Sequence, residues 1–152
     1  MDDRFRFRAW DKFKKVMRFV YSIDMTPQCE DISYIGTVDG RSNDVWCYTK
    51  GHNCEEYDIA ALEIMRCTGL KDKNGKTLIY EGDIVVRVLE FLTSKLETKM
   101  RVFYNENHGA YCIKDINGHN ETYLHDYLHM DFKLEVVGNI FENPELLESE
   151  GV

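Results

Sequence analysis

The cysteines and histidines are the residues of this chain that could hold a metal ion. Two groups stand out by their spacing, namely Cys47, His52 and Cys54, and later His119, His125 and His129. A structural zinc site needs about four nitrogen or sulfur ligands, usually with cysteines paired about two to four residues apart. Neither group has that pattern, and His125 and His129 would share a face only on a helix. We therefore predict ordinary thiols and surface imidazoles, with no metal and no other cofactor.

Motifs for nucleophilic catalysis and for phosphate binding are absent from the sequence. There is no Gly-x-Ser-x-Gly elbow, no cysteine in a known protease context, no P-loop and no Gly-x-Gly-x-x-Gly turn. The 27 acidic residues offer many pairs of carboxylates, so no single pair stands out as an acid and base. We predict that the protein is not an enzyme, and no small-molecule substrate is indicated.

The charge of the chain is unevenly distributed. The net charge is −8, but residues 1–20 carry seven basic and three acidic side chains. That segment therefore has a charge of +4 and the remainder −12, which disfavours long-range attraction to a polyanion. The candidate binding residues are Arg4, Arg6 and Arg8, together with Trp10, which could belong to an exposed aromatic surface for a peptide or a base. Either the basic residues simply face solvent, or they give weak nucleic-acid binding, with a dissociation constant of roughly 10⁻⁴ M or worse.

Features of secreted or membrane proteins are missing. No apolar run approaches the roughly 18–20 residues that span a bilayer, and no apolar segment follows the first positive charges as in a signal peptide. The five cysteines are odd in number and irregularly spaced, which favours reduced thiols over a disulfide framework. These features predict a cytoplasmic protein without a membrane partner.

The first part of the chain predicts a hairpin followed by an irregular segment. Residues 4–10 alternate arginine with apolar residues, which is typical of a half-buried strand, and residues 16–21 resume an extended run. We expect the basic residues on the solvent face of this hairpin and around its turn. Residues 22–58 predict only short strands and turns. Residues 55–65 suit a helix by composition, but we favour a strand over their last half.

The second part of the chain has clearer strand and turn signals. Asn74 and Gly75 suit a turn with positive φ at both positions, and Gly82 and Asp83 suit a second tight turn. The predicted strands are 78–80, 84–88, 98–104, 110–116 and 134–141. Asn143 is expected to cap a short terminal helix that begins at Pro144. Strands joined by short polar turns favour a small barrel or roll.

Three separated stretches resemble the YopX family. They are 5–11, which reads FRFRAWD, then TGLKDKNGK at 68–76 with YEGDIV at 80–85, and EVVGNIFENPELL at 135–147. They make up about a quarter of the chain and occur in the family's order. Three residues, 77–79, separate two of these motifs where the family usually has two, which predicts a β-bulge. The resemblance implies a bacteriophage or prophage origin and an SH3-like barrel in the C-terminal part. It supplies no catalytic residue, because no molecular activity is established for the family.

These observations predict a mainly β protein with a minor α component. Residues 1–60 would form a hairpin-containing segment, and residues 61–152 an SH3-like barrel with a short terminal helix. We expect an accessory protein of a phage or prophage that acts by binding in the cytoplasm of its bacterial host. The favoured class is a protein-interaction or oligomerising module, because the first strand leaves an unpaired edge that could pair with another copy. The alternative is a nucleic-acid-binding small barrel that uses the basic hairpin.

Overall fold

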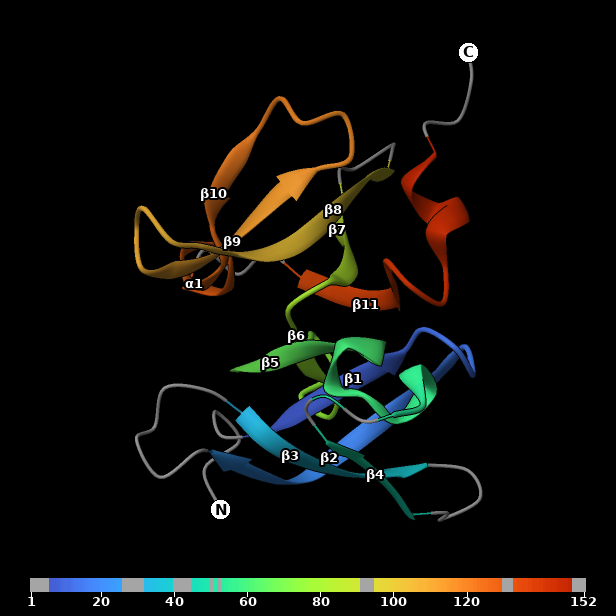
Figure 1. The fold of residues 1–152 in the computed structure, drawn as a ribbon. Helices are drawn as coiled ribbons and strands as arrows, with labels where there is room; N and C mark the ends of the chain where they lie inside the picture. The colour runs from blue at the N-terminus through green and yellow to red at the C-terminus, as the bar shows by residue number, and fades with distance from the viewer. Residues whose placement is uncertain are drawn as a thin grey trace. The chain divides into compact units, whose positions relative to one another are not determined.

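Antiparallel β-sheet dominates the structure, as the sequence predicted (Figure 1). The computed structural model describes residues 6–25, 32–39, 45–49, 51, 53–90, 95–129 and 133–148. The chain divides into two compact units, Phe5–Arg66 and Cys67–Val152, the second of which also includes Met1–Arg4. The division between the two units lies inside a strand, Leu62–Lys71. No helix in the described part of the chain is long and apolar enough to cross a membrane.

The first unit is a sheet built on the predicted hairpin. Its elements are β1 (Phe7–Asp11), β2 (Val16–Met25), β3 (Ile32–Asp39), β4 (Val45–Thr49), η2 (Glu55–Tyr57), η3 (Ile59–Ala61) and the start of β5 (Leu62–Lys71). The strand order is β4-β3-β2-β1-β5, and neighbouring strands are antiparallel. The first strand pairs with β2 on one side and with β5 on the other, so the prediction that it leaves an unpaired edge is wrong. Two short 3-10 turns precede β5, so the expectation of a strand over the last half of 55–65 is confirmed.

The second unit contains a five-stranded antiparallel sheet. Its elements after β5 are β6 (Leu78–Tyr80), β7 (Asp83–Glu90), β8 (Lys95–Asn105), β9 (Ala110–Asp115), β10 (Glu121–Tyr123), α1 (Leu124–His129), β11 (Lys133–Asn139) and η4 (Pro144–Leu147). The sheet order is β10-β9-β8-β7-β11, and the end of β5 pairs with β6. Among the described residues, β10 and β11 are the two edge strands of this sheet and do not pair with each other. The SH3-like barrel therefore stays a prediction.

Each unit has its own apolar cluster. In the first unit the buried members are Ala9, Ile35, Tyr48, Ala61 and Leu62. In the second unit they are Ile79, Val85, Met100, Val102, Ile113, Leu124 and Leu134. The alternation of side chains along a strand places the members that lie on neighbouring strands on the same face of the sheet. Leu124 comes from α1, a helix that was not among the predicted elements.

The predicted turns are present, but their details differ from expectation. Gly82 has a φ of +82°, and the Asp83 carboxylate accepts a hydrogen bond from the Tyr80 amide at 2.7 Å, which confirms a structural turn. In the other turn only Gly75 has a positive φ, +67°, because Asp72 holds the loop instead. The Asp72 carboxylate accepts hydrogen bonds from the Asn74 amide at 3.1 Å and the Asn74 side chain at 3.2 Å.

Two further local predictions are corrected. The sequence predicted a β-bulge at residues 77–79, but the irregular pairing lies on β5. Cys67 pairs with Tyr80 and Lys71 pairs with Leu78, so the extra residues between the two pairs belong to β5 and not to β6. Pro144 does begin the short terminal helix, but the Asn143 side chain makes no capping hydrogen bond to it. The Asn143 side-chain oxygen instead accepts a hydrogen bond from the Asn139 amide at 3.4 Å.

A candidate binding groove held by a buried polar network

An open groove lies beside the turn between β1 and β2 in the first unit. Its volume is about 500 Å³, and its lining residues are Lys12, Phe13, Glu55, Asp58, Ala60 and Ala61. The apolar lining comes from Phe13 and the two alanines, and charged groups of both signs surround it. Phe13 is 52% exposed, which leaves much of its ring accessible.

The β1–β2 turn that carries Phe13 is tightly fixed. One carboxylate oxygen of Asp11 accepts hydrogen bonds from the amides of Phe13 at 3.0 Å and Lys14 at 2.9 Å. The amide of Lys12 donates to the carbonyl of Ala61 at 2.9 Å, which ties the turn to η3. Lys15 completes the turn with a φ of 55°, in the left-handed region that few residues other than glycine adopt. The position of Phe13 is therefore set by Asp11.

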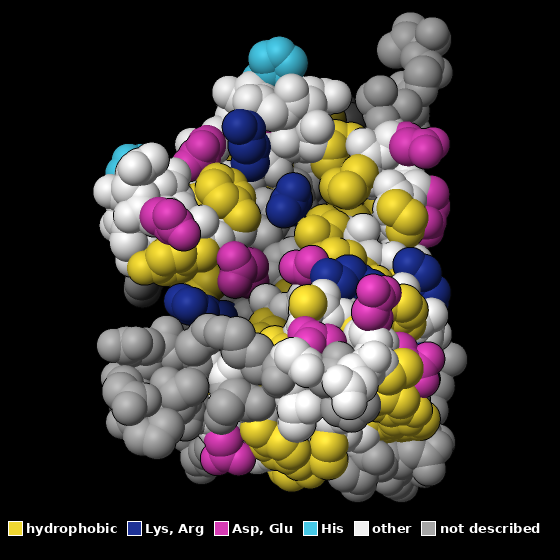
Figure 2. All heavy atoms as spheres, in the orientation of Figure 1, with side chains coloured by type: hydrophobic (Ala, Val, Ile, Leu, Met, Phe, Trp, Pro, Cys, Tyr) yellow, Lys and Arg dark blue, Asp and Glu magenta, His cyan; other side chains and the backbone are white. Residues whose placement is uncertain are grey.

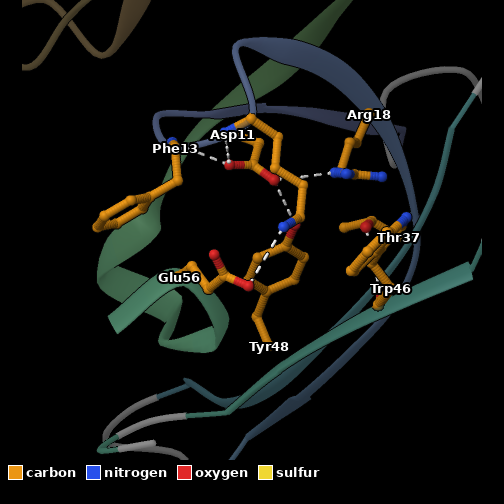
Figure 3. Close-up of polar contacts among 8 residues, drawn as sticks. Asp11, Phe13, Arg18, Thr37, Trp46, Tyr48 and Glu56 are labelled. Carbon is orange, nitrogen blue, oxygen red and sulfur yellow. Dashed lines mark hydrogen bonds and ion pairs between the residues drawn. The ribbon is translucent and has the colours of Figure 1, made fainter. Parts of the chain in front are cut away.

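The second oxygen of Asp11 is the centre of a buried network (Figure 3). It accepts hydrogen bonds from Arg18 Nε at 3.2 Å and from the Tyr48 hydroxyl at 2.6 Å. Asp11 and Tyr48 are completely buried, and Arg18 is 2% exposed. The network thus joins β1, β2 and β4. Buried charges are tolerated when they are paired and hydrogen-bonded in this way.

The burial of Arg18 corrects the prediction that the basic residues of the hairpin face solvent. Arg18 lies opposite Ala9 in the β1–β2 register, and Ala9 belongs to the buried face of the sheet. Since neighbouring residues of a strand point to opposite faces, Phe19 projects outward and is 50% exposed. The usual distribution of charged and apolar side chains is therefore inverted in this part of β2.

The charges of the network follow from its hydrogen bonds. Burial alone would raise the pKa of Asp11, but hydrogen bonds from Lys14, Tyr48 and Arg18 outweigh it and lower that pKa. Burial and the hydrogen bond to Asp11 raise the pKa of Tyr48. The carboxylate is therefore ionised and the phenol neutral at pH 7. These pKa shifts leave neither group poised for proton transfer near neutral pH.

Two cations and two aromatic rings extend the network toward η2. The Arg18 guanidinium carbon lies 5.0 Å from the centre of the Trp46 ring, and Lys14 Nζ lies 4.5 Å from the same centre. The Trp46 and Tyr57 rings are stacked with centres 5.9 Å apart. Lys14 Nζ also lies 3.4 Å from a carboxylate oxygen of Glu56. These contacts fix η2, which contributes Glu55 to the groove.

The predicted binding residues that the structure describes, Arg6, Arg8 and Trp10, do not line this groove. Arg4 lies outside the described residues, Arg6 is exposed and Arg8 is half-buried. Trp10 is only 8% exposed, which leaves little of its ring for a ligand. A binding role for these residues stays a prediction. Sequence reasoning missed Phe13, whose signal is a large apolar residue inside a charged turn.

Ion pairs reduce the free positive charge of the hairpin. Lys12 Nζ lies 3.3 Å from Glu63, Lys14 pairs with Glu56, and Arg18 pairs with Asp11. On the face drawn in Figure 2, basic and acidic side chains are interspersed and not separated by sign. Both observations weaken the case for a continuous phosphate-binding surface, which needs clustered basic residues.

The cysteine and histidine groups singled out from the sequence form no ligand cluster within the described residues. Cys47 Sγ lies 2.9 Å from the Tyr34 hydroxyl, and His125 Nε2 lies 2.8 Å from Asp126. His52 and the side chain of His129 lie outside the described residues. No group of three nearby ligands in the described ranges includes Cys47, Cys54, His119 or His125.

Differences in burial among the thiols predict differences in their reactivity. Cys47 and Cys54 are exposed, whereas Cys67 and Cys112 are 2% and 1% exposed. Burial and the nearby charge of Glu121 also raise the pKa of Cys112. We expect an alkylating reagent at pH 7.5 to label both exposed thiols at least about tenfold faster than the buried ones. Timed alkylation with peptide mass spectrometry checks this, and labelling of Cys112 as fast as Cys47 would contradict the structure.

Comparisons with known proteins identify the family. The family model described as "YopX protein" matches residues 6–148. The chain belongs to the YopX family. The resemblance of the three sequence stretches is thereby confirmed.

Two solved structures of similar proteins share the fold. Protein EF1440 from Enterococcus faecalis is 26% identical, with 94% of this chain and 97% of that chain covered and a TM-score of 0.54. Protein yopX from Bacillus subtilis is 17% identical, with 95% and 99% covered and a TM-score of 0.57. A comparison with curated proteins gives no match. The YopX fold therefore extends over nearly the whole chain, but no activity comes with it.

Proposed function

We propose that this YopX-family protein is a non-enzymatic protein-interaction module, and that the groove beside the β1–β2 turn receives an apolar side chain of its partner. The observation that carries the proposal is the half-exposed ring of Phe13, which lines the groove together with Ala60 and Ala61. Exposed apolar groups with a charged rim are typical of protein-binding surfaces. The rim here is formed by Lys12, Glu55 and Asp58.

The rigidity of the turn supports this proposal. Binding loses free energy to the ordering of side chains and loops, so a surface that is already ordered binds more tightly. Phe13 sits on a turn that Asp11 fixes through two backbone hydrogen bonds. Aromatic residues in such positions often contribute a large share of binding energy.

The proposal also includes the genetic origin of the protein and its location in the cell. A phage or prophage would encode it, and it would act as an accessory protein in the cytoplasm of the bacterial host. The C-terminal unit would be an SH3-like barrel that completes the antiparallel sheet. The occupant of the groove is either a host or phage protein or a second copy of this chain. Nucleic-acid binding ranks lower, because three basic side chains of the hairpin already have carboxylate partners.

Site-specific photo-cross-linking tests the proposal. A benzophenone amino acid replaces Phe13 in the full chain, which is produced in the bacterial host and irradiated. We expect a discrete protein adduct at position 13. An adduct of twice the 17.9 kDa chain mass would identify a second copy as the occupant, and any other mass would identify a different partner.

Matched variants make the test specific. The same cross-linker at Tyr21, which is 56% exposed, is expected to give no such adduct, because Tyr21 does not line the groove. Ala60→Arg should fill the groove and abolish the adduct at position 13, while the circular dichroism spectrum stays unchanged. The proposal would be refuted if position 13 gave no protein adduct, or if Ala60→Arg left the adduct intact.

A further inference from the structure

Three metal-binding side chains gather on one face of the sheet in the second unit. They are His108 in the turn between β8 and β9, Cys112 on β9 and Glu121 on β10. A ring nitrogen, the thiol sulfur and a carboxylate oxygen of these residues all lie within 4.8 Å of one another. Donor atoms bound to one zinc ion lie about 3–4 Å apart, since each metal–ligand bond is about 2.0–2.3 Å long. Small side-chain rotations would therefore bring the three donor atoms within bonding distance of one ion.

Strand pairing explains why these residues meet. Cys112 lies directly opposite Tyr123 in the β9–β10 register, and Glu121 precedes Tyr123 by two residues. Residues two apart on a strand point to the same face, so Glu121 and Cys112 share that face. The turn at 106–109 brings His108 to the same place, where its ring meets Tyr123 edge-on with centres 5.6 Å apart. The three donors thus come from short, well-paired elements.

Within the described part of the chain, His108 and Cys112 make no strong competing interaction, and Glu121 uses only one of its two carboxylate oxygens. The Cys112 thiol makes only a long contact of 3.9 Å to the Ala110 carbonyl. The ring nitrogens of His108 have no hydrogen-bond partner among the described residues. One oxygen of Glu121 accepts a hydrogen bond from the Asn105 side chain at 2.6 Å. That bond orients the carboxylate, as partners of metal ligands commonly do, and leaves the second oxygen for an ion.

We propose that His108, Cys112 and Glu121 form a three-ligand site for a zinc-type divalent cation, with a fourth position open to water or an external ligand. The mixture of nitrogen, sulfur and oxygen donors suits Zn²⁺, whereas Mg²⁺ and Ca²⁺ prefer oxygen alone. His108 and Glu121 are exposed, so an ion can reach two of the three donors directly from solvent. The site is independent of the groove in the first unit.

The spacing of these ligands explains why sequence reasoning did not find them. His108 and Cys112 are four residues apart across a turn, and Glu121 follows nine residues later in the next strand. Zinc motifs in sequence rely on closely paired cysteines or on helical spacing. Here the donors converge only because the β8–β9 turn and the paired strands β9 and β10 bring them to one face.

Titration with cobalt and zinc tests the site. The chelator-treated full-length protein is titrated with Co²⁺ as the only added metal. We expect one Co²⁺ per chain, with the thiolate-to-cobalt charge-transfer absorption that signals a sulfur ligand and the intense visible bands of four-coordinate cobalt. Zn²⁺ should displace Co²⁺ and bleach both features. Absence of saturable one-to-one binding would overturn the proposal.

Variants identify the ligands. Cys112→Ser should remove the charge-transfer band, and His108→Gln should weaken Zn²⁺ binding by more than about 100-fold, since loss of a partner that only orients a ligand already costs roughly 10–100-fold. His108 is exposed, so His108→Gln keeps the test valid if Cys112→Ser does not fold. His119→Gln and the double variant Cys47→Ser/Cys54→Ser are controls that should bind normally. Retention of the sulfur band in Cys112→Ser, or its loss in the Cys47/Cys54 variant, would refute the assignment.

Discussion

Replacement of Asp11 with Asn is expected to lower the free energy of unfolding by about 3–5 kcal/mol. The amide side chain has nearly the same shape and can still accept hydrogen bonds from the backbone of the turn. It cannot neutralise Arg18, which is 2% exposed and would keep a buried charge without its counterion. Urea unfolding of the full chain at pH 7, followed by circular dichroism, measures the loss.

Two further variants separate charge pairing from general sensitivity to mutation. Glu63→Gln removes a carboxylate from an exposed ion pair with Lys12, so its effect should stay below about 1 kcal/mol. Combining Asp11→Asn with Arg18→Met removes both charges and should recover much of the lost stability, because apolar replacements of buried pairs are often neutral. Equal effects of Asp11→Asn and Glu63→Gln would show that the buried pair is not held as described.

The interactions of the Asp11 carboxylate also determine how the free energy of unfolding depends on pH. Because the folded protein lowers the pKa of Asp11, the unfolded chain binds this proton more readily. The stabilisation is therefore fully present above the unfolded pKa of about 3.9, and it is lost as the pH falls through the lower folded value. The stability difference between the wild type and Asp11→Asn should shrink as the pH falls below about 4. A difference that stays constant from pH 7 to pH 3 would contradict an ionised Asp11.

Replacement of Leu124 with Ala is expected to lower the free energy of unfolding by about 2–5 kcal/mol. Leu124 is completely buried in the apolar cluster of the second unit, so the shorter side chain leaves a cavity. Alanine favours a helix at least as well as leucine, so the loss reports packing and not helix propensity. Urea unfolding with the wild type in parallel measures the change.

Leu96 provides a matched control for this substitution. It lies on β8 of the same unit but is 51% exposed, so Leu96→Ala should change stability by less than about 0.5 kcal/mol. A large effect at Leu96 together with a small one at Leu124 would mean that α1 does not cover the core as the structure shows.

The proposed groove depends on the buried network in a way that stability measurements alone do not reveal. Asp11 uses one oxygen to hold Phe13 and Lys14 and the other to hold Arg18 and Tyr48. A change that loosens this carboxylate would therefore also loosen the turn that presents Phe13. Ala60→Arg alters the groove from η3 and changes no residue of the network, which is why it is the better variant for testing binding.

The sequence by itself determined the β class, the first hairpin, the main turns and the family. These features depend on local signals, because alternation within a strand and glycine at a positive φ require only neighbouring residues. Gly82 and the 7–20 hairpin are examples that the structure confirms. The three YopX-like stretches lie within the range 6–148 of the family match, apart from Phe5 at its edge.

Only the tertiary structure decided which polar side chains are buried and which residues form sites. The sequence predicts that Arg18 faces solvent. In the structure the side chain of Arg18 is bonded to Asp11, and β4 contributes Tyr48, which lies 30 residues after Arg18 in the chain. The cluster of His108, Cys112 and Glu121 likewise arises from the pairing of β9 with β10. Such contacts join residues that are distant in sequence, and no local pattern encodes them. Local propensity selects the strands, but pairing register and packing decide which side chains meet.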